Sequence, residues 1–225
     1  MSERDKHLRL GILGGTFDPI HIAHLRIAEE VLGGLELDKV CFIPGAMPPH
    51  KTRQRISPFE DRLAMTRMAV KDTPFFEVLD LEGRRKGPSY SVQTLREIHL
   101  MYGEKLELFF IIGMDAFQEI KTWWEYRNLF DYANFVLINR PGFSIKDLES
   151  FIYSLDASLD KKKDADGFIS PSGNSLFCSE VSMLDISSTN IKKMVSAGKS
   201  IRFLVPEPIR VYIQEKGLYK NHERY

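Results

Sequence analysis

Two glycines and two histidines near the start of the chain have the types and spacing of a phosphate-binding site. The segment GGTFDPIHIAH (residues 14–24) directly follows an apolar run. Glycines let a ligand approach the backbone closely, and the amides and dipole of a helix start attract phosphate. His21 and His24 are three residues apart, so they share one face of a first helical turn. We therefore predict that both rings bind one polyphosphate.

Two other interpretations of the histidine pair stay open. Asp18, His21 and His24 also have a spacing that clusters metal ligands, and one of the histidines could simply cap the helix or pack. The glycine pair favours phosphate. No GxxxxGK[ST] segment occurs in the chain, which excludes a P-loop, and the first loop lacks the GxGxxG pattern of dinucleotide-binding folds.

A second cluster of hydroxyl groups precedes a cation near the end of the chain. Ser187, Ser188 and Thr189 are consecutive, and Lys192 follows one helical turn later. Ordinary helix capping needs a single serine, so capping alone does not account for three hydroxyls and a cation. The pattern favours a second phosphate-binding helix start.

The elements that must position these residues alternate in type. Apolar runs at 8–13, 39–43, 75–79, 106–112 and 135–138 are typical of strands buried on both faces, as in a parallel sheet. Helices are predicted between them, starting after Asp18-Pro19, at a capping box from Ser57, and at Tyr90. This alternation predicts an α/β fold with a Rossmann-like, doubly wound parallel sheet, helices on both faces, and a single domain over residues 1–225.

The alternation weakens after residue 142. Residues 156–175 carry a lysine run and turn residues, and we interpret them as an exposed excursion, either a mobile flap or a small hairpin. Regular structure is expected to resume at Ser187, with helices over about 187–219 that end at Gly198 and Gly217.

Composition limits the class of protein. Lys plus Arg and Asp plus Glu are both 31, and this neutral balance argues against a general nucleic-acid binder. The first ten residues lack an apolar signal segment, and the longest apolar stretch, 106–114, is too short to span a bilayer. Cys41 and Cys178 form no CxxC pair. We expect a cytoplasmic protein that binds neither nucleic acid nor membrane; the sequence indicates no oligomeric state.

Several segments together resemble one enzyme family. GGTFDPIHIAH and ISSTNIK (186–192) are similar to the HxGH and ISSTxxR motifs of a nucleotidyltransferase superfamily. Within it, the nicotinate mononucleotide adenylyltransferases are indicated by further matches, which come in that family's order: PPHK (48–51), GPSYSVQTL (87–95), IIGMD (111–115), Trp123, RPG (140–142), VPEP (205–208) and YIQEKGLY (212–219). The resemblance covers nearly the whole chain except 156–175.

The resemblance implies roles for the matching positions. The implied ATP site consists of Gly14, Gly15, Thr16, Phe17, His21, His24, Gly113, Asp115, Arg140, Ser187, Ser188, Thr189 and Lys192. The implied acceptor site consists of His50, Lys51, Ser89, Tyr90, Ser91, Asp115, Trp123 and Arg140. His21, His24 and Lys192 would be the catalytic residues, and no metal ligand is assigned to the protein.

Physical reasons accompany some of these roles. Trp123 would stack on the nicotinate ring, although one of two adjacent tryptophans usually packs inward. Ser89, Tyr90 and Ser91 would offer helix-start amides, which favour a pyridine carboxylate over a neutral carboxamide. Asp115 would accept bonds from ribose hydroxyls, or it simply caps a helix.

Three positions depart from the family motifs. Ala23 stands where HxGH has glycine, Lys192 where ISSTxxR has arginine, and Ser91 where the family has threonine. Lysine keeps the charge but loses the bidentate fork of arginine. These departures bear on the rate of the reaction more than on its type.

The implied reaction is adenylyl transfer from ATP, with Mg²⁺ as its metal, to nicotinate mononucleotide, which gives nicotinate adenine dinucleotide and pyrophosphate. The attacking phosphate is already an anion, so no general base is required, and positioning with charge neutralisation suffices. Alternatives are a nicotinamide mononucleotide or pantetheine-phosphate acceptor, or a silent nucleotide-binding module.

Overall fold

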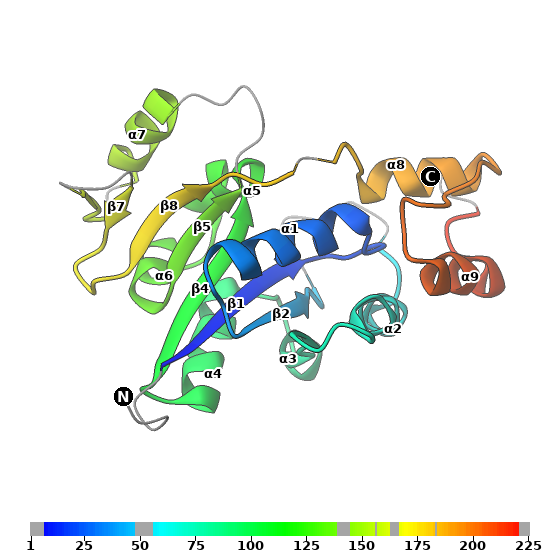
Figure 1. Ribbon diagram of the computed structural model, residues 1–225, viewed down its shortest axis with the longest axis horizontal. Helices are drawn as coiled ribbons and strands as arrows, with labels where there is room; N and C mark the ends of the chain where they lie inside the picture. The colour runs from blue at the N-terminus through cyan, green and yellow to red at the C-terminus, as the bar shows by residue number, and fades with distance from the viewer. Residues whose placement is uncertain are drawn as a thin grey trace.

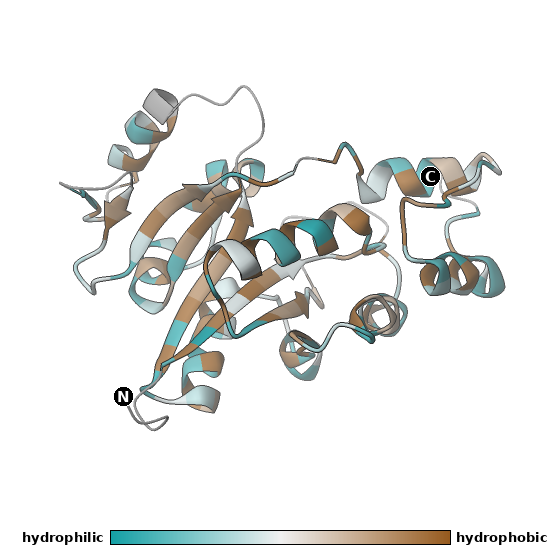
Figure 2. Ribbon diagram, viewed as in Figure 1, coloured by the Kyte–Doolittle hydropathy of each residue, from teal (hydrophilic) through white to brown (hydrophobic). Residues whose placement is uncertain are grey.

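The five predicted strands are present in the computed structural model, which describes residues 7–47, 56–138, 145–155, 157–162, 167–182 and 184–220. These strands are β1 (Leu8–Gly15), β2 (Lys39–Pro44), β3 (Phe76–Val78), β4 (Leu106–Gly113) and β5 (Asn134–Ile138). The apolar side chains of β1, β2, β4 and β5 are mostly buried on both faces, whereas those of the edge strand β3 are half-buried. Figure 2 shows β4 and β5 as strongly hydrophobic. Near-continuous hydrophobicity therefore predicted them correctly.

The described strands join one eight-stranded sheet in the order β3-β2-β1-β4-β5-β8-β7-β6. β1 is parallel to both of its neighbours, with Leu10 opposite Lys39 of β2 and opposite Leu108 of β4. The chain therefore extends from β1 to one side through β2 and β3, and to the other through β4 and β5 (Figure 1). At such a switch point, a crevice opens outside the carboxyl ends of the strands, where open α/β sheets bind ligands.

Helices cover both faces of the sheet. One face carries α1 (Ile22–Gly34), α2 (Phe59–Val70), α8 (Ser188–Ser196) and α9 (Glu207–Lys216), and the other carries α3 (Leu81–Arg84), α4 (Ser91–Tyr102), α5 (Met114–Gln118), α6 (Tyr126–Tyr132) and α7 (Ile145–Tyr153). A short 3₁₀ turn, η3 (Ile120–Thr122), follows α5. In β4, Phe109 and Ile111 pack under the first set, whereas Leu108 and Phe110 pack under the second. This alternation of strand side chains confirms the doubly wound fold.

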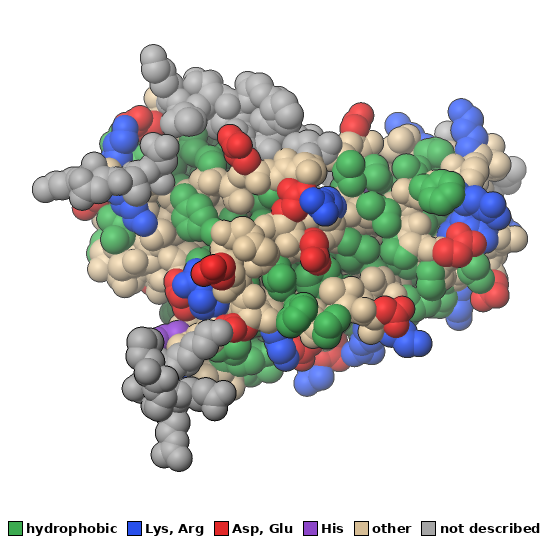
Figure 3. Space-filling model, viewed as in Figure 1, with side chains coloured by type: hydrophobic (Ala, Val, Ile, Leu, Met, Phe, Trp, Pro, Cys, Tyr) green, Lys and Arg blue, Asp and Glu red, His purple; other side chains and the backbone are tan. Residues whose placement is uncertain are grey.

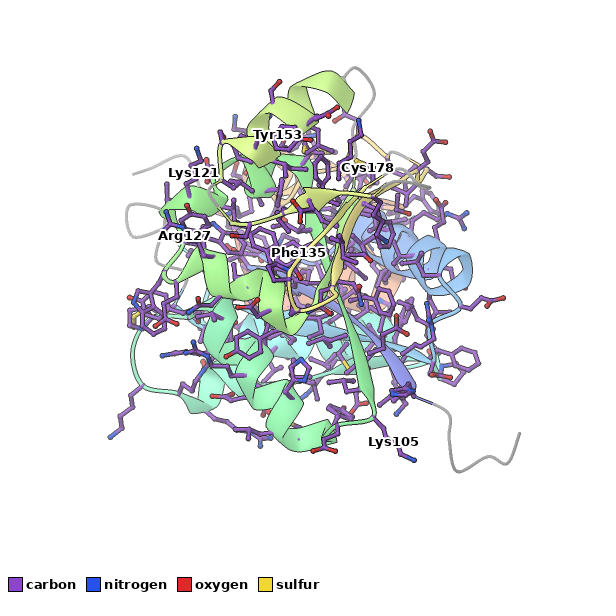
Figure 4. All side chains as sticks on the ribbon, turned by 90° about the vertical axis from the view of Figure 1, so that its left-hand side faces the viewer. Lys105, Lys121, Arg127, Phe135, Tyr153 and Cys178 are labelled. Carbon is purple, nitrogen blue, oxygen red and sulfur yellow. The ribbon has the colours of Figure 1, made fainter. Side chains whose placement is uncertain are left out.

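Apolar side chains fill the interior of the molecule, and most charged side chains lie on its surface. Phe135 of β5 is fully buried among the strands and α6, whereas Lys105, Lys121 and Arg127 lie at the outside (Figure 4). Acidic and basic side chains are interspersed over the face shown in Figure 3, and several Lys and Arg side chains gather at the end formed by α8 and α9. Among the described residues, no helix is long and apolar enough to cross a membrane.

Two helix starts differ from the prediction. α1 begins at Ile22 with His21 as its N-cap, not directly after Asp18-Pro19. α2 begins at Phe59 with Pro58 as N-cap and without a side-chain cap, so the predicted capping box is wrong. At α1 the cap is formed by the histidines, because the His21 N–H donates to Nδ1 of His24. At α2 the Ser57 amide donates to Asp18, and the Ser57 carbonyl accepts from Arg62.

The region after residue 142 is more regular than predicted. Part of the excursion is a small hairpin, β6 (Asp160–Lys161) with β7 (Phe168–Ile169), as one alternative had it. It is not simply exposed, because Phe168 is buried in the core. Sequence reasoning missed β8 (Ser175–Ser179), which pairs in parallel with β5, and also missed α7. β8 is short and of mixed polarity, so its burial comes from its neighbours rather than from its own hydrophobicity. Residues 156 and 163–166 lie outside the described residues.

Candidate active site

A cavity of about 610 Å³ opens at the switch point, beyond the carboxyl ends of β1 and β4. Most of the residues implicated by sequence reach it. The predicted site residues that line this cavity are Gly14, Gly15, Thr16, His21, His24, Ser89, Tyr90, Ser91, Gly113, Asp115, Trp123, Ser187, Ser188 and Thr189. The fold therefore brings together segments that lie more than 170 positions apart in the sequence.

The loop after β1 is held in place by a buried arginine. Arg62 of α2 is only 1% exposed, and its guanidinium donates to the carbonyls of Thr16 at 2.7 Å, Gly45 at 2.6 Å and Ala46 at 3.2 Å. Burial lowers the pKa of Arg62 from its usual value, and Asp18 opposes that shift. Arg62 thus ties the glycine loop to the end of β2 and sets the wall of the cavity.

Sequence reasoning missed Arg62, although a signal was present. Arg62, Met65, Thr66 and Val70 are the buried residues of α2, and their helical spacing marks one inward face. An arginine on such a face must find acceptors inside the protein. The carbonyls it finds belong to loops far away in sequence, so the acceptors themselves were not predictable.

The two histidines meet as predicted. Their rings stack with centroids 3.7 Å apart, and the His21 backbone N–H donates to Nδ1 of His24 at 3.3 Å. His21 is 5% exposed, and its Nδ1 is buried without a hydrogen-bond partner in the described part of the chain. Burial lowers the pKa of His21 to about 4, so the ring is neutral at pH 7. A neutral ring with an unpartnered nitrogen beside a cavity is suited to bind a ligand.

The metal interpretation of the pair is not supported. The Asp18 carboxylate is bound by Lys192 and Tyr219 instead of facing the histidines. Within the described ranges, no group of three His, Cys, Asp or Glu residues could hold a metal ion.

The hydroxyl cluster also lines the cavity, at the start of α8. Ser187 is the N-cap, and its hydroxyl accepts from the Asn190 amide at 3.2 Å. Ser188 donates to the Pro19 carbonyl at 2.9 Å. The capping role thus accounts for Ser187, and Ser188 joins α8 to the first loop. All three hydroxyl residues still line the cavity.

Two predicted ATP-site residues lie elsewhere. Phe17 is 2% exposed and packs edge-on against His24 at 5.1 Å, so it supports the loop from the core rather than lining the cavity. Lys192 is 9% exposed, does not line the cavity, and its Nζ lies 3.1 Å from Oδ2 of Asp18. Its charge is thus neutralised inside the protein.

The Asp18 carboxylate is held in its charged form. Burial by itself raises the pKa of Asp18, but hydrogen bonds from Ser57 and Tyr219 and the charge of Lys192 together lower it below the usual value. Burial, together with the Asp18 charge, raises the pKa of Tyr219, so the phenol keeps its proton. Asp18 thus anchors the glycine loop that follows β1.

The predicted acceptor end forms around the start of α4. Tyr90 is the N-cap of α4, and Ser91 is its first residue. Ser89 does not offer its amide to a ligand, because that N–H donates to the Met47 carbonyl at 3.0 Å. The Ser89 hydroxyl accepts from the amides of Ala46 and Met47. Ser89 is therefore a structural tie, and the helix-start amides left for an anion begin at Ser91.

The adjacent tryptophans divide their roles. Trp123 is half-buried and packs edge-on against Phe110 at 6.3 Å, and Trp124 lies against Tyr90 at 4.9 Å. Trp124 is the more exposed ring, yet both line the cavity. A flat ligand ring would therefore meet two aromatic side chains, one of which the sequence reasoning did not assign.

The remaining predicted residues are at the end of β4 or outside the described part. Gly113 is the N-cap of α5, and Asp115 lies in its first turn; both line the cavity. Of the motif departures, Ala23 and Ser91 line the cavity as well. His50, Lys51 and Arg140 lie outside the described residues.

The fold and the site define a nucleotidyltransferase, and comparison with known proteins agrees. A sequence model of the cytidylyltransferase-like family matches residues 12–194. A Geobacter metallireducens protein named "Probable nicotinate-nucleotide adenylyltransferase" is 47% identical over 218 residues, covering 96% of this chain and 100% of that protein. A Geotalea daltonii protein of the same name is 44% identical over 215 residues, covering 95% and 99%.

Solved structures share the fold. The Plasmodium falciparum nicotinic acid mononucleotide adenylyltransferase complexed with NaAD superimposes with a TM-score of 0.73 at 18% identity, covering 95% of this chain and 98% of that one. The same enzyme complexed with APC gives a TM-score of 0.68 at 20% identity, with the same coverage. The chain therefore belongs to the cytidylyltransferase-like family and, within it, to the nicotinate-nucleotide adenylyltransferases, as the sequence resemblance predicted.

Proposed function

We propose that this protein transfers the adenylyl group of ATP to nicotinate mononucleotide, a step of NAD biosynthesis. The observation that carries the proposal is a single cavity with two different ends. One end has the glycine loop, His21 and the start of α8, and the other has the start of α4 beside two tryptophans. Relatives at 44–47% identity bear the name of this activity.

The reaction is an in-line displacement. An oxygen of the acceptor 5′-phosphate forms a bond to the α-phosphorus of ATP, and the bond from that phosphorus to the bridging oxygen breaks. Pyrophosphate leaves with the electron pair. The nucleophile is an anion at neutral pH, so the residues need only hold both nucleotides in line, which is worth about 7–11 kcal/mol.

The ATP end supplies hydrogen-bond donors rather than a general base. We assign His21 and His24 to the ATP phosphates, because His21 is neutral and has a buried nitrogen without a partner in the described structure. Gly14, Gly15 and Thr16 line the cavity with them, and so do Ser187, Ser188 and Thr189 at the α8 start. Preorganised donors of this kind stabilise the charge that develops on the leaving group.

The acceptor end discriminates by charge. Tyr90 and Ser91, at the start of α4, line the cavity, and the amides and positive dipole end of a helix start favour a carboxylate over a carboxamide. Trp123 and Trp124 would hold the pyridine ring between them. This arrangement favours nicotinate over nicotinamide mononucleotide, and it has no counterpart for an acyclic pantetheine phosphate.

Magnesium enters as part of the substrate MgATP. The described residues contain no cluster of three His, Cys, Asp or Glu side chains that would hold a metal ion. Mg²⁺ prefers phosphate oxygens and water, and it often binds through few protein ligands. A cytoplasmic location, where ATP is supplied, remains our expectation from the sequence.

The test is turnover with competing acceptors. Purified protein is mixed with ATP, Mg²⁺ and nicotinate mononucleotide, and pyrophosphate and dinucleotide are quantified. Parallel reactions contain nicotinamide mononucleotide or phosphopantetheine. We expect nicotinate adenine dinucleotide to form with the highest kcat/KM. A higher kcat/KM with a different acceptor would show another activity of the same family. ATP binding without pyrophosphate release from any acceptor would indicate a silent nucleotide-binding module.

A further inference from the structure

One buried carboxylate joins three segments that are distant in sequence. Oδ1 of Asp18 accepts from the Tyr219 hydroxyl at 2.8 Å, and Oδ2 accepts from Lys192 Nζ at 3.1 Å. The Ser57 amide also donates to Oδ2, at 3.4 Å. Asp18 is 3% exposed, so water does not screen these contacts.

Uncharged contacts bind the same segments together. Ser188 of α8 donates to the Pro19 carbonyl at 2.9 Å, and the Ile22 amide donates to the Leu204 carbonyl at 2.9 Å. The loop from 16 to 22 is thus attached to the C-terminal part of the chain at Pro19 and Ile22, both of which follow Asp18. Figure 1 shows this C-terminal part, with α8 and α9, at one end of the molecule.

The side chains of this cluster do not line the cavity, but residues close to them in sequence do. Asp18, Lys192 and Tyr219 are absent from the cavity lining, whereas Thr16 and His21 flank Asp18, and Thr189 lies one turn before Lys192. The cluster therefore acts on the cavity through the residues beside it. Lys192 is neutralised by Asp18, so its position does not indicate a phosphate ligand.

We propose that Asp18 is a positioning residue. Its carboxylate, held by Lys192 and Tyr219, fixes the distance between two sides of the cavity, one formed by the two histidines and the other by the start of α8. The proposal rests on the function proposed above. In-line transfer depends on the relative placement of these two sides, and displacements of about 1 Å can cost about 100-fold in rate. Lys192 contributes by holding Asp18, not by contact with the nucleotide.

The first test uses two matched tyrosines. Tyr219→Phe removes the hydroxyl on Asp18, and Tyr212→Phe removes a hydroxyl that donates to Asp61 at the same 2.8 Å distance. Both tyrosines belong to the C-terminal segment. We expect Tyr219→Phe to lower kcat/KM for ATP about tenfold relative to Tyr212→Phe, with both variants assayed at a temperature at which their melting curves show them to be folded. Equal activity of the two variants overturns the proposal.

A second test separates positioning from direct contact for Lys192. Asp18→Asn, Lys192→Met and the double variant form a mutant cycle, and the double variant also removes the unpaired buried charge that each single change leaves. If Lys192 acts through Asp18, the double variant is no slower than the worse single variant. Additive losses in kcat show that Lys192 contacts the substrate, and they contradict the proposal.

Binding of a non-reacting ATP analogue keeps this test independent of the acceptor. α,β-Methylene-ATP is titrated into wild type and into the two tyrosine variants. If wild type binds the analogue but makes no dinucleotide, the proposed function fails while weaker binding by Tyr219→Phe still supports the positioning role. If wild type binds no analogue, both proposals are overturned.

Discussion

Nδ1 of His24 accepts a hydrogen bond from the backbone N–H of His21, with the two imidazole rings stacked 3.7 Å apart. An accepting Nδ1 carries no proton, so the ring N–H of His24 is on Nε2. The N-terminal turn of α1 thus sets the tautomer of one ring and the stacking of the other. Both rings line the cavity, and their stacking restricts how each can rotate.

Replacing His21 is expected to affect the chemical step more than ATP binding. In His21→Ala, we expect kcat to fall about 10²–10³-fold, the usual loss for one preorganised donor, with a small change in KM for ATP. Steady-state pyrophosphate release measures both constants. His7→Ala, which removes an exposed histidine away from the cavity, is the control. An unchanged kcat in His21→Ala would contradict the role assigned to this ring.

Acid is expected to destabilise the protein through His21. Burial lowers the pKa of the folded-state ring from 6.5 to about 4. Between those values the unfolded chain binds the proton and the folded protein does not, so the free energy of unfolding falls as pH falls. From pH 7 to pH 5 this amounts to about 2 kcal/mol.

Urea unfolding of wild type and His21→Gln at both pH values checks this expectation. The glutamine variant should lose less stability on acidification, because it has no ring to protonate in the unfolded state. Equal losses in the two proteins show that other groups cause the acid sensitivity.

The backbone amide of Ser91 can be removed without breaking α4. Ser91 is the first residue of this helix, where proline is tolerated, and Tyr90 before it has the extended backbone that proline requires. We expect Ser91→Pro to reduce the preference for nicotinate over nicotinamide mononucleotide by about tenfold, because a charge-assisted hydrogen bond is lost. Ser91→Ala retains the amide and should keep the preference. kcat/KM for the two acceptors gives the comparison; an unchanged ratio in the proline variant places carboxylate recognition elsewhere.

The adjacent glycines of the first loop should respond differently to a methyl group. A Cβ at Gly15 would lie 2.8 Å from the ring of Phe17, which is packed in the core, so Gly15→Ala is expected to cost about 1–3 kcal/mol of stability. At Gly14 the nearest atom is 3.9 Å away, on Phe110, which also lines the cavity. Gly14→Ala should therefore fold normally and raise KM for a substrate. Melting temperature and KM distinguish the two, and a reversed pattern contradicts this account of the loop.

Local sequence determined much of this protein. Continuous hydrophobicity is typical of strands inside a parallel sheet, so β1 to β5 were predictable. The alternation of these strands with helices made the doubly wound arrangement predictable as well. The glycine loop, the two histidines and the three hydroxyl residues, each selected from local sequence, all line the same cavity. These signals are local, because each depends on residues within a few positions of one another.

Tertiary structure alone decided what the charged and half-buried residues do. Lys192 has the spacing of a phosphate ligand, yet it pairs with Asp18, which is 174 positions away. Ser89 lies at a helix start, yet its amide donates to Met47. β8, in which only Leu176 is buried, joins the sheet by pairing with β5. A hydrogen bond or ion pair needs a specific partner at a specific distance. Sequence identifies such a residue as capable of the contact, and only the fold determines which partner it meets.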